Sequence, residues 1–95
     1  MKINVDELQE ALTTLLLRLK DYRGDGVELK EDYYWDFCSD EMFDFSKKPV
    51  DFSIGQLTDD WETIKNNVKS DTLIAYDLER LSKILRVLSI ENPGF

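Results

Sequence analysis

Apolar residues recur with the period of an α-helix in three stretches of the chain. In the first stretch, successive apolar positions are three or four residues apart, so they share one helical face. They are Val5, Leu8, Leu12, Leu15, Leu19 and Tyr22. Asn4 and Glu7 have the spacing of a capping box, and Gly24 suits the left-handed backbone that ends many helices. The pattern predicts a helix over about residues 5–22.

The second stretch repeats this spacing and has its own start signal. Its apolar positions are Ile54, Leu57, Trp61, Ile64 and Val68. Ser53 is a suitable N-cap, and Gln56, three residues later, completes a capping box. We therefore expect a helix over about residues 54–68, in which Trp61 faces the core.

The third stretch again has helical spacing. Its apolar positions are Ile74, Leu78, Leu81, Leu85 and Leu88. Ser70 or Asp71 can cap it, and Asn92-Pro93-Gly94 ends it. Because only about two residues would separate the second and third helices, we expect them to pack as an antiparallel hairpin. The first helix can cover the groove between them.

Residues 24–52 carry the least regular pattern. Val27–Glu31 alternate apolar and polar residues, which suits a short extended segment, but no partner strand is evident. Three residues of the aromatic stretch have helical spacing and could form one short turn of helix: Tyr34, Phe37 and Cys38. The expected fold is a mostly α, small helical domain of three main helices with an irregular acidic-aromatic connection, and residues 1–95 form a single domain.

Aromatic rings and carboxylates are interleaved in residues 32–45, which we call the acidic-aromatic segment. It holds six of the chain's eleven aromatic residues and five of its twenty acids, and it has no Lys or Arg. Tyr33, Tyr34 and Trp35 are consecutive, so they cannot all point inward, and at least one should be partly exposed. The segment is either a core plug whose acids point outward or a surface for a basic partner.

The net charge of −8 is concentrated in the middle of the chain. Residues 1–23 sum to 0, residues 24–64 to −9 and residues 65–95 to +1. Phosphate binding needs a basic face, so this balance disfavours DNA, RNA and anionic membranes as partners and favours a cationic protein. A run of charge is also commonly no more than a solvated surface.

The residue types that several kinds of catalysis need are missing. There is no histidine and Cys38 is the only cysteine, which excludes Ser-His and Cys-His pairs and a structural zinc site. Asp59 and Asp60 fit a charge pair at a helix N-terminus better than a metal or catalytic dyad. Residues 21–32 imitate a calcium loop but place Arg23 at a ligand position. We expect no cofactor, no metal and no enzymatic activity.

No stretch of the sequence indicates export or membrane insertion. The N-terminal residues lack the apolar run of a signal peptide, and no apolar stretch approaches membrane-spanning length. A single cysteine forms no intramolecular disulfide and does not require an oxidising compartment. We therefore expect a cytoplasmic protein.

A set of short motifs resembles a group of small bacterial proteins. The motifs are Tyr33-Tyr34-Trp35-Asp36, Pro49, Ser53-Ile54-Gly55-Gln56-Leu57-Thr58-Asp59-Asp60-Trp61-Glu62, and Tyr76 with Leu78, Leu81 and Ile84-Leu85-Arg86. The group is that of immunity proteins of contact-dependent growth inhibition and related polymorphic toxin systems. The resemblance covers about residues 32–88 and implies a protein that binds and neutralises a cognate toxin domain.

The resemblance and the charge together give a hypothesis for the binding surface. Many toxin domains are basic nucleases, so carboxylates and aromatic anchors could cover their surface. The expected contact residues are Tyr33, Trp35, Asp36, Asp40, Glu41 and Asp44, with Asp59, Asp60 and Glu62 adding to the electrostatic field. The protein would act as a monomer or in a 1:1 heterodimer with the toxin.

Two other classes of function remain open on sequence alone. An acidic nucleic-acid mimic, or an antitoxin-like regulator, would use the same acids on a basic protein and would bind several unrelated basic partners rather than one. A small enzyme that uses two carboxylates would show turnover or a requirement for a divalent metal.

Overall fold

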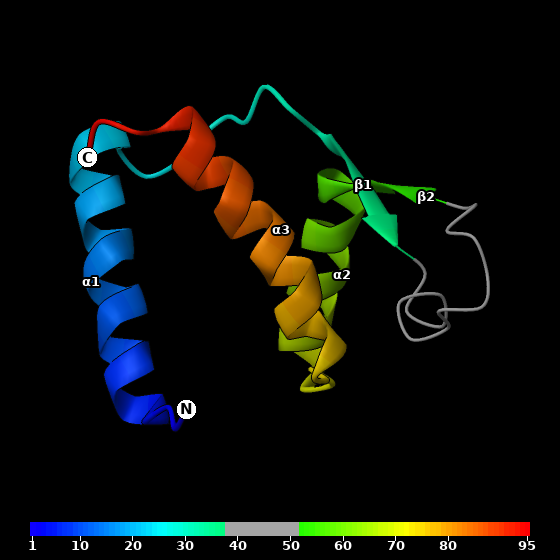
Figure 1. The fold of residues 1–95 in the computed structure, drawn as a ribbon, viewed down its shortest axis with the longest axis horizontal. Helices are drawn as coiled ribbons and strands as arrows, with labels where there is room; N and C mark the ends of the chain where they lie inside the picture. The colour runs from blue at the N-terminus through cyan, green and yellow to red at the C-terminus, as the bar shows by residue number, and fades with distance from the viewer. Residues whose placement is uncertain (38–51) are drawn as a thin grey trace. The chain divides into compact units, whose positions relative to one another are not determined.

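A computed structural model describes residues 1–37 and 52–95 of the chain. These residues form three helices and a two-stranded antiparallel sheet, the β1–β2 hairpin (Figure 1). The elements are α1 (Val5–Arg23), β1 (Tyr33–Phe37), β2 (Phe52–Gln56), α2 (Leu57–Ser70) and α3 (Tyr76–Glu91). The predicted small, mostly helical domain with three main helices is confirmed, and the hairpin is an addition to it.

The chain falls into two compact units. Unit 1 consists of Met1–Glu28 and Asn92–Phe95, and unit 2 consists of Leu29–Glu91. Unit 1 is built on α1, and unit 2 contains the hairpin, α2 and α3. The predicted placement of the first helix over the groove between the other two stays a prediction.

The two ends of α1 follow the sequence signals. Asn4 Oδ1 accepts a hydrogen bond from the Glu7 N–H at 3.1 Å, which satisfies one free donor of the first turn. Gly24 has a φ of +89°, a backbone angle that side chains with a Cβ rarely adopt, and its N–H donates to the Lys20 carbonyl. Both predicted ends of this helix are confirmed to within one residue.

The last four residues of the chain close the C-terminal end of α1. Arg23 Nε donates to Asn92 Oδ1 at 2.7 Å, and Asn92 is only 4% exposed. The rings of Tyr22 and Phe95 are 6.3 Å apart between centroids. Hydrogen bonds from a charged donor are stronger than neutral ones. Residues from both ends of the sequence therefore form one unit.

The predicted start of the second helix is wrong. Phe52–Gln56 form β2, so Ser53 is not an N-cap, and Gln56 precedes the helix without a capping side-chain hydrogen bond. β2 pairs antiparallel with β1 in the register Tyr33↔Gln56, Tyr34↔Gly55, Trp35↔Ile54, Asp36↔Ser53 and Phe37↔Phe52. The helical turn expected from Tyr34 onward is also wrong. Aromatic residues favour extended backbone once a second strand is there to pair with.

α2 and α3 pack side by side as antiparallel helices, as predicted (Figure 1). The link, residues 71–75, is longer than expected because Asp71 takes a left-handed φ of 54° and ends α2. The cap predicted at Ser70 or Asp71 is therefore wrong. Instead, the Asp77 carboxylate accepts from the Ile74 N–H at 2.9 Å, as the acidic residue three positions after the N-cap does in a capping box.

The core of unit 2 is centred on α2. Leu57 and Ile64 are buried there, and five apolar residues of α3 are half-buried: Leu81, Ile84, Leu85, Val87 and Leu88. The predicted core position of Trp61 is wrong, because its side chain is 47% exposed. Lys65 Nζ lies 5.9 Å from the centroid of its ring. A large indole in contact with an ammonium group can stay half in water.

Candidate functional site

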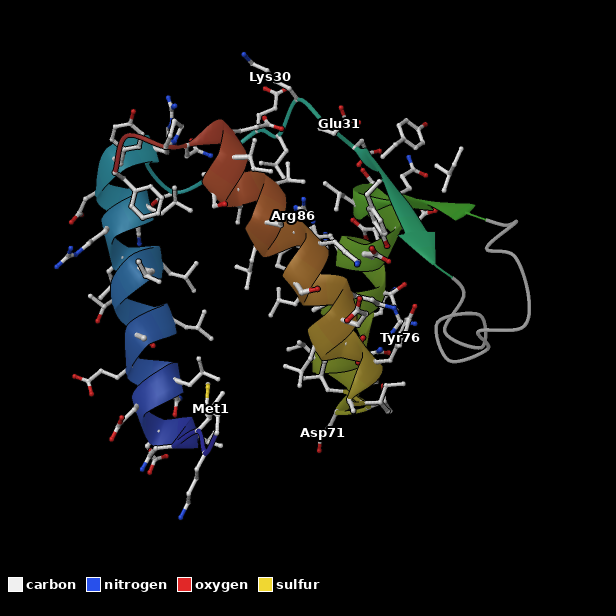
Figure 2. The ribbon with its side chains drawn as sticks, in the orientation of Figure 1. Met1, Lys30, Glu31, Asp71, Tyr76 and Arg86 are labelled. Carbon is white, nitrogen blue, oxygen red and sulfur yellow. The ribbon has the colours of Figure 1, made fainter. Side chains whose placement is uncertain are left out.

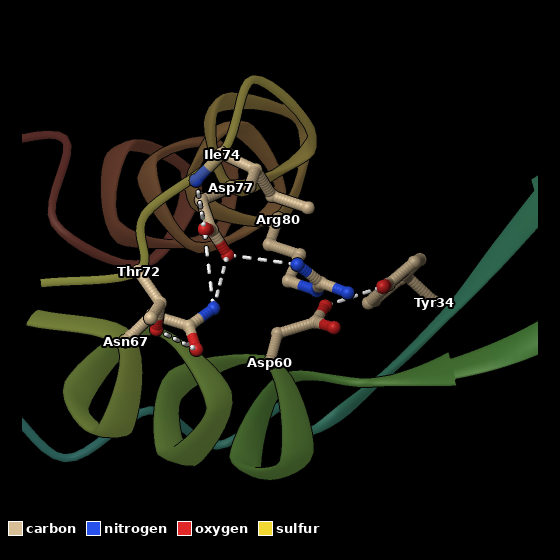
Figure 3. A network of polar contacts seen from close by, with 7 residues as sticks. All are labelled: Tyr34, Asp60, Asn67, Thr72, Ile74, Asp77 and Arg80. Carbon is tan, nitrogen blue, oxygen red and sulfur yellow. Dashed lines mark hydrogen bonds and ion pairs between the residues drawn. The ribbon is translucent and has the colours of Figure 1, made fainter. Parts of the chain in front are cut away.

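One face of the β1–β2 hairpin lies against the helices of unit 2. Tyr34 is on this face, which we call the inner face. Its hydroxyl donates to the Asp60 carboxylate on α2 (Figure 3), and Lys83 Nζ of α3 lies 5.7 Å from its ring centroid. A half-buried ring whose hydroxyl has a partner connects the strand to both helices.

The inner face requires glycine at position 55. Gly55 is paired with Tyr34, and a Cβ added to Gly55 would lie 2.1 Å from Tyr34 Cζ. No side chain fits within that distance, so the Tyr34 ring crosses directly over the Gly55 backbone. Glycine inside a strand commonly marks such a close approach.

The opposite face of the hairpin, the outer face, carries exposed apolar side chains. Tyr33 precedes Tyr34 and Ile54 precedes Gly55, and successive strand residues point to opposite sides. The Tyr33 and Ile54 side chains are 58% and 62% exposed. They border an open hollow of about 590 Å³ that is lined by Glu31, Tyr33, Tyr34 and Ile54. Exposed apolar groups around a hollow are suited to contact with another molecule.

Asp32 joins the start of β1 to the start of α2. Its backbone carbonyl accepts from the Leu57 N–H at 2.7 Å, and its Oδ1 accepts from the N–H and hydroxyl of Thr58 at 2.9 and 2.7 Å. Its Oδ2 accepts from Gln56 Nε2 at 2.7 Å. The bonds from Gln56 and Thr58 hold the pKa of the Asp32 carboxyl below its usual value. Asp32 thus replaces the missing N-cap of α2.

A second carboxylate holds the segment that leads into β1. Glu91, the last residue of α3, accepts from the backbone N–H of Lys30 at 2.7 Å and of Glu31 at 3.0 Å. Figure 2 shows Lys30 and Glu31 side by side on this segment. The two backbone bonds lower the pKa of the Glu91 carboxyl. Glu31 therefore reaches the hollow from backbone that is anchored to α3.

A third carboxylate stabilises the turn between α2 and α3 (Figure 3). Asp77 is 6% exposed and accepts from Arg80 Nη1 at 2.8 Å and from Asn67 Nδ2 at 3.2 Å, besides the Ile74 N–H. The Ile74 backbone bond, assisted by Arg80 and Asn67, lowers the pKa of the Asp77 carboxyl although burial opposes this. Asn67 also accepts from the Thr72 hydroxyl. This network is satisfied within unit 2 and serves the fold.

The structure places some of the contact residues that were predicted in the acidic-aromatic segment. Tyr33 is exposed on the outer face, which confirms that one of the three consecutive aromatic residues points outward. Trp35 and Asp36 lie in β1, where they pair with Ile54 and Ser53 of β2. The other three predicted contact residues lie outside the described residues: Asp40, Glu41 and Asp44.

The three acids predicted on α2 lie near its N-terminal end but are not equivalent. Asp59 and Asp60 are in the first turn, which confirms the predicted charge pair there. Asp60 accepts from Tyr34, and Glu62 pairs with Lys65 Nζ at 2.8 Å. Asp59 is exposed and makes no hydrogen bond or ion pair with any residue that the structure describes.

Four residues that shape this site were not predicted from the sequence. They are Glu31, Asp32, Ile54 and Gly55. One signal was present: Phe52, Ser53 and Ile54 alternate apolar and polar, which is the period of a strand. The same residues also fit a helix start, so the local pattern supported both structures.

Neither metal binding nor membrane crossing is indicated in residues 1–37 and 52–95. These residues contain no group of three or more His, Cys, Asp or Glu that could hold a metal ion. None of their helices is both long enough and apolar enough to cross a membrane. No protein-family model matches the chain, and searches of curated proteins and of solved structures find no match. Function is therefore inferred from the outer face and from the sequence.

Proposed function

We propose that the protein is an immunity protein that binds a cognate toxin domain, of basic nuclease type, and neutralises it stoichiometrically without turnover. The observation that carries the proposal is the outer face. Tyr33 and Ile54 are exposed there, on a hairpin whose inner face is bound to two helices. This hairpin belongs to residues 24–64, whose net charge is −9. Apolar anchors on an acidic, pre-organised support suit a basic protein surface.

The acids and the apolar groups would have different roles in such a complex. Carboxylates attract a basic partner over distance and raise the rate of association. Tyr33 and Ile54 would lose contact with water in the complex and slow its dissociation. The charge of Asp60 and Glu62 still adds to the field, although both are hydrogen-bonded or paired within unit 2. The carboxylate of Asp59 is exposed and has no such bond to a described residue, so a partner's Lys or Arg can meet it directly.

Co-expression tests the proposal. The chain is produced together with the product of the reading frame directly upstream in its own genome, and growth and co-purification are scored across a salt series. We expect the neighbour to be toxic alone, the chain to restore growth, and a salt-sensitive 1:1 complex to co-purify. A harmless neighbour that does not bind the chain contradicts the proposal. Binding to several unrelated basic proteins would favour a nucleic-acid mimic instead.

Paired substitutions on the outer face test the assigned surface. Tyr33→Ser combined with Ile54→Ser should weaken toxin binding about 30-fold or more, because buried aromatic anchors commonly dominate an interface. Binding is measured by calorimetry, with circular dichroism to check that the fold is kept. Tyr76→Ser is the matched control, since Tyr76 is 51% exposed at the start of α3. Equal effects of the two variants would remove the outer face from the interface.

Charge reversal tests the acids of the acidic-aromatic segment. Asp40, Glu41 and Asp44 are changed together to Lys. We expect weaker toxin binding and a flatter dependence of affinity on salt, with the fold intact, because fewer charge contacts remain to be screened. The control reverses three exposed acids elsewhere: Glu10, Asp21 and Glu28. An unchanged affinity in the folded test variant would exclude these three acids from the interface.

A further inference from the structure

We propose that the hollow on the outer face receives an arginine side chain of the basic partner, with Glu31 as the residue that binds its charge. The inference rests on the proposed function for the kind of partner. It adds a defined subsite and the chemical group that occupies it. The hollow is open to the surface, so a side chain can enter it without movement of the hairpin.

Glu31 is anchored by its backbone, and only one of its two carboxylate oxygens accepts a hydrogen bond from a described residue. Its backbone N–H donates to Glu91 at 3.0 Å, and its own Oε1 accepts from the Tyr33 N–H at 3.2 Å. Its Oε2 has no hydrogen-bond donor or cation among the residues that the structure describes. One carboxylate oxygen, on anchored backbone, is therefore free to accept a hydrogen bond from a ligand.

The rest of the lining selects the kind of ligand. The exposed Tyr33 and Ile54 make most of the wall apolar, and Glu31 is its charged group within the described part of the chain. Tyr34 also borders the hollow, although its ring lies on the inner face. A purely apolar occupant would remove water from the Glu31 carboxylate without replacing its hydrogen bonds, which is costly. An anion would be repelled. The ligand that fits is a cation with an apolar stem.

Arginine fits this lining better than lysine does. Its guanidinium is planar, weakly hydrated and able to stack on an aromatic ring while it donates to a carboxylate. Lysine carries a compact and strongly hydrated charge that gains less from an open aromatic wall. The acidic surroundings of the hairpin, with a net charge of −9 over residues 24–64, further favour a cation at this position.

A titration of the isotope-labelled full chain tests the subsite without any partner protein. The probe is Nα-acetyl-arginine amide, followed by NMR. We expect saturable chemical-shift changes centred on Glu31, Tyr33 and Ile54. The isosteric neutral probe, Nα-acetyl-citrulline amide, should cause none. Equal shifts with both probes, or shifts spread over all exposed acids, would overturn the proposal.

Substitutions sharpen the result. Glu31→Gln keeps an oxygen that can accept from the Tyr33 N–H but removes the charge, and it should abolish saturable binding of the arginine probe. Tyr33→Leu keeps apolar bulk and should weaken probe binding about two- to fivefold by removing the aromatic ring. Glu28→Gln is the control of equal charge change, because Glu28 is exposed and lies outside the hollow. Probe binding by Glu31→Gln at the wild-type level would contradict the assignment.

The toxin complex separates this inference from the proposed function. If a cognate toxin binds the chain and Glu31→Gln weakens that complex while Glu28→Gln does not, the partner uses the subsite. A complex that Glu31→Gln leaves unchanged overturns the subsite and leaves the immunity role standing. A third outcome is that the arginine probe binds the hollow but the product of the upstream reading frame is harmless. This outcome overturns the immunity role and assigns the hollow to another arginine-bearing partner.

Discussion

At the scale of single residues, the contact between Tyr34 and Gly55 decides whether the hairpin can lie against the helices. The Tyr34 hydroxyl reaches Asp60 on α2 only because its ring passes over a backbone that has no Cβ. Any larger residue at position 55 must displace the ring, and with it the hydrogen bond to Asp60. The outer face is carried by the same two strands and therefore depends on this contact.

Gly55→Ala should lower the free energy of unfolding by about 1–3 kcal/mol, the usual cost of forcing an extra group into a packed site. Urea unfolding followed by circular dichroism measures it. Gly26→Ala is the matched control, because nothing lies within 4 Å of a Cβ at Gly26. In a Tyr34→Ala background the cost of Gly55→Ala should fall. A cost that stays the same would show that the ring is not the obstacle.

Residue types alone predicted the exposure of an aromatic residue but not the role of Gly55. Three consecutive aromatic residues cannot share one side of any regular backbone, which follows from geometry. The need for glycine arises from a ring that is twenty-one positions away in the sequence and adjacent only in the folded sheet. Such a requirement is set by strand pairing and leaves no mark in the local pattern.

At the scale of elements, the start of α2 shows how a local signal can be overridden. Ser53 and Gln56 have the spacing of a capping box, yet residues 52–56 pair with β1 and the helix begins at Leu57. The capping acceptor comes instead from Asp32, twenty-six positions before Thr58. By contrast, α1 was predicted correctly at both ends because Asn4 and Gly24 act on their immediate neighbours.

Asp32→Ala should expose the first turn of α2 selectively. The Thr58 N–H loses its acceptor, whereas the Leu57 N–H keeps the Asp32 backbone carbonyl. We expect amide hydrogen exchange to accelerate several-fold at Thr58 and much less at Leu57. Asp32→Asn, which keeps an acceptor oxygen, should lie between the wild type and Asp32→Ala. Equal acceleration at both amides would mean that the whole hairpin had detached.

At the scale of the whole molecule, three carboxylates hold the elements of unit 2 together: Asp32, Asp77 and Glu91. Asp32 and Glu91 join parts distant in sequence, and Asp77 stabilises the turn between α2 and α3. Each has a pKa below its usual value, which is 3.8 for aspartate and 4.5 for glutamate. The folded state therefore binds fewer protons than the unfolded chain between the lowered and the usual values. Their stabilisation is complete above about pH 4.5 and is lost as the pH falls through the lowered pKa values.

We expect the urea midpoint of the wild type to fall between pH 6 and pH 3 for this reason. Asp32→Asn should be less stable at pH 6 and show a smaller fall, because one of the three contributions is already absent. Glu28→Gln should keep the wild-type fall, since Glu28 makes no hydrogen bond to a described residue. Protonation of the other acids at low pH reduces the repulsion between them in all three proteins, so this effect on stability cancels when their midpoints are compared. Identical falls in wild type and Asp32→Asn would contradict the prediction.

The prediction of three helices, two of them an antiparallel pair, is confirmed. It rests on apolar periodicity, which identifies a helix even when its ends are misplaced by a few residues. The binding surface was predicted only in outline. Tyr33 was named from its neighbours, but Ile54 and Glu31 become part of the same surface through strand register and through the Glu91 bonds. Those links join residues that are up to sixty positions apart.

The contact of Asn92–Phe95 with the end of α1 sets an order on synthesis. Arg23 and Tyr22 are made early, but their partners Asn92 and Phe95 are translated only after all of unit 2. Unit 2 can therefore form its core before the last turn of α1 has contacted Asn92 and Phe95. A chain truncated after Glu91 keeps all of unit 2, so amide exchange should stay slow at Leu57 and Ile64 but accelerate at the end of α1.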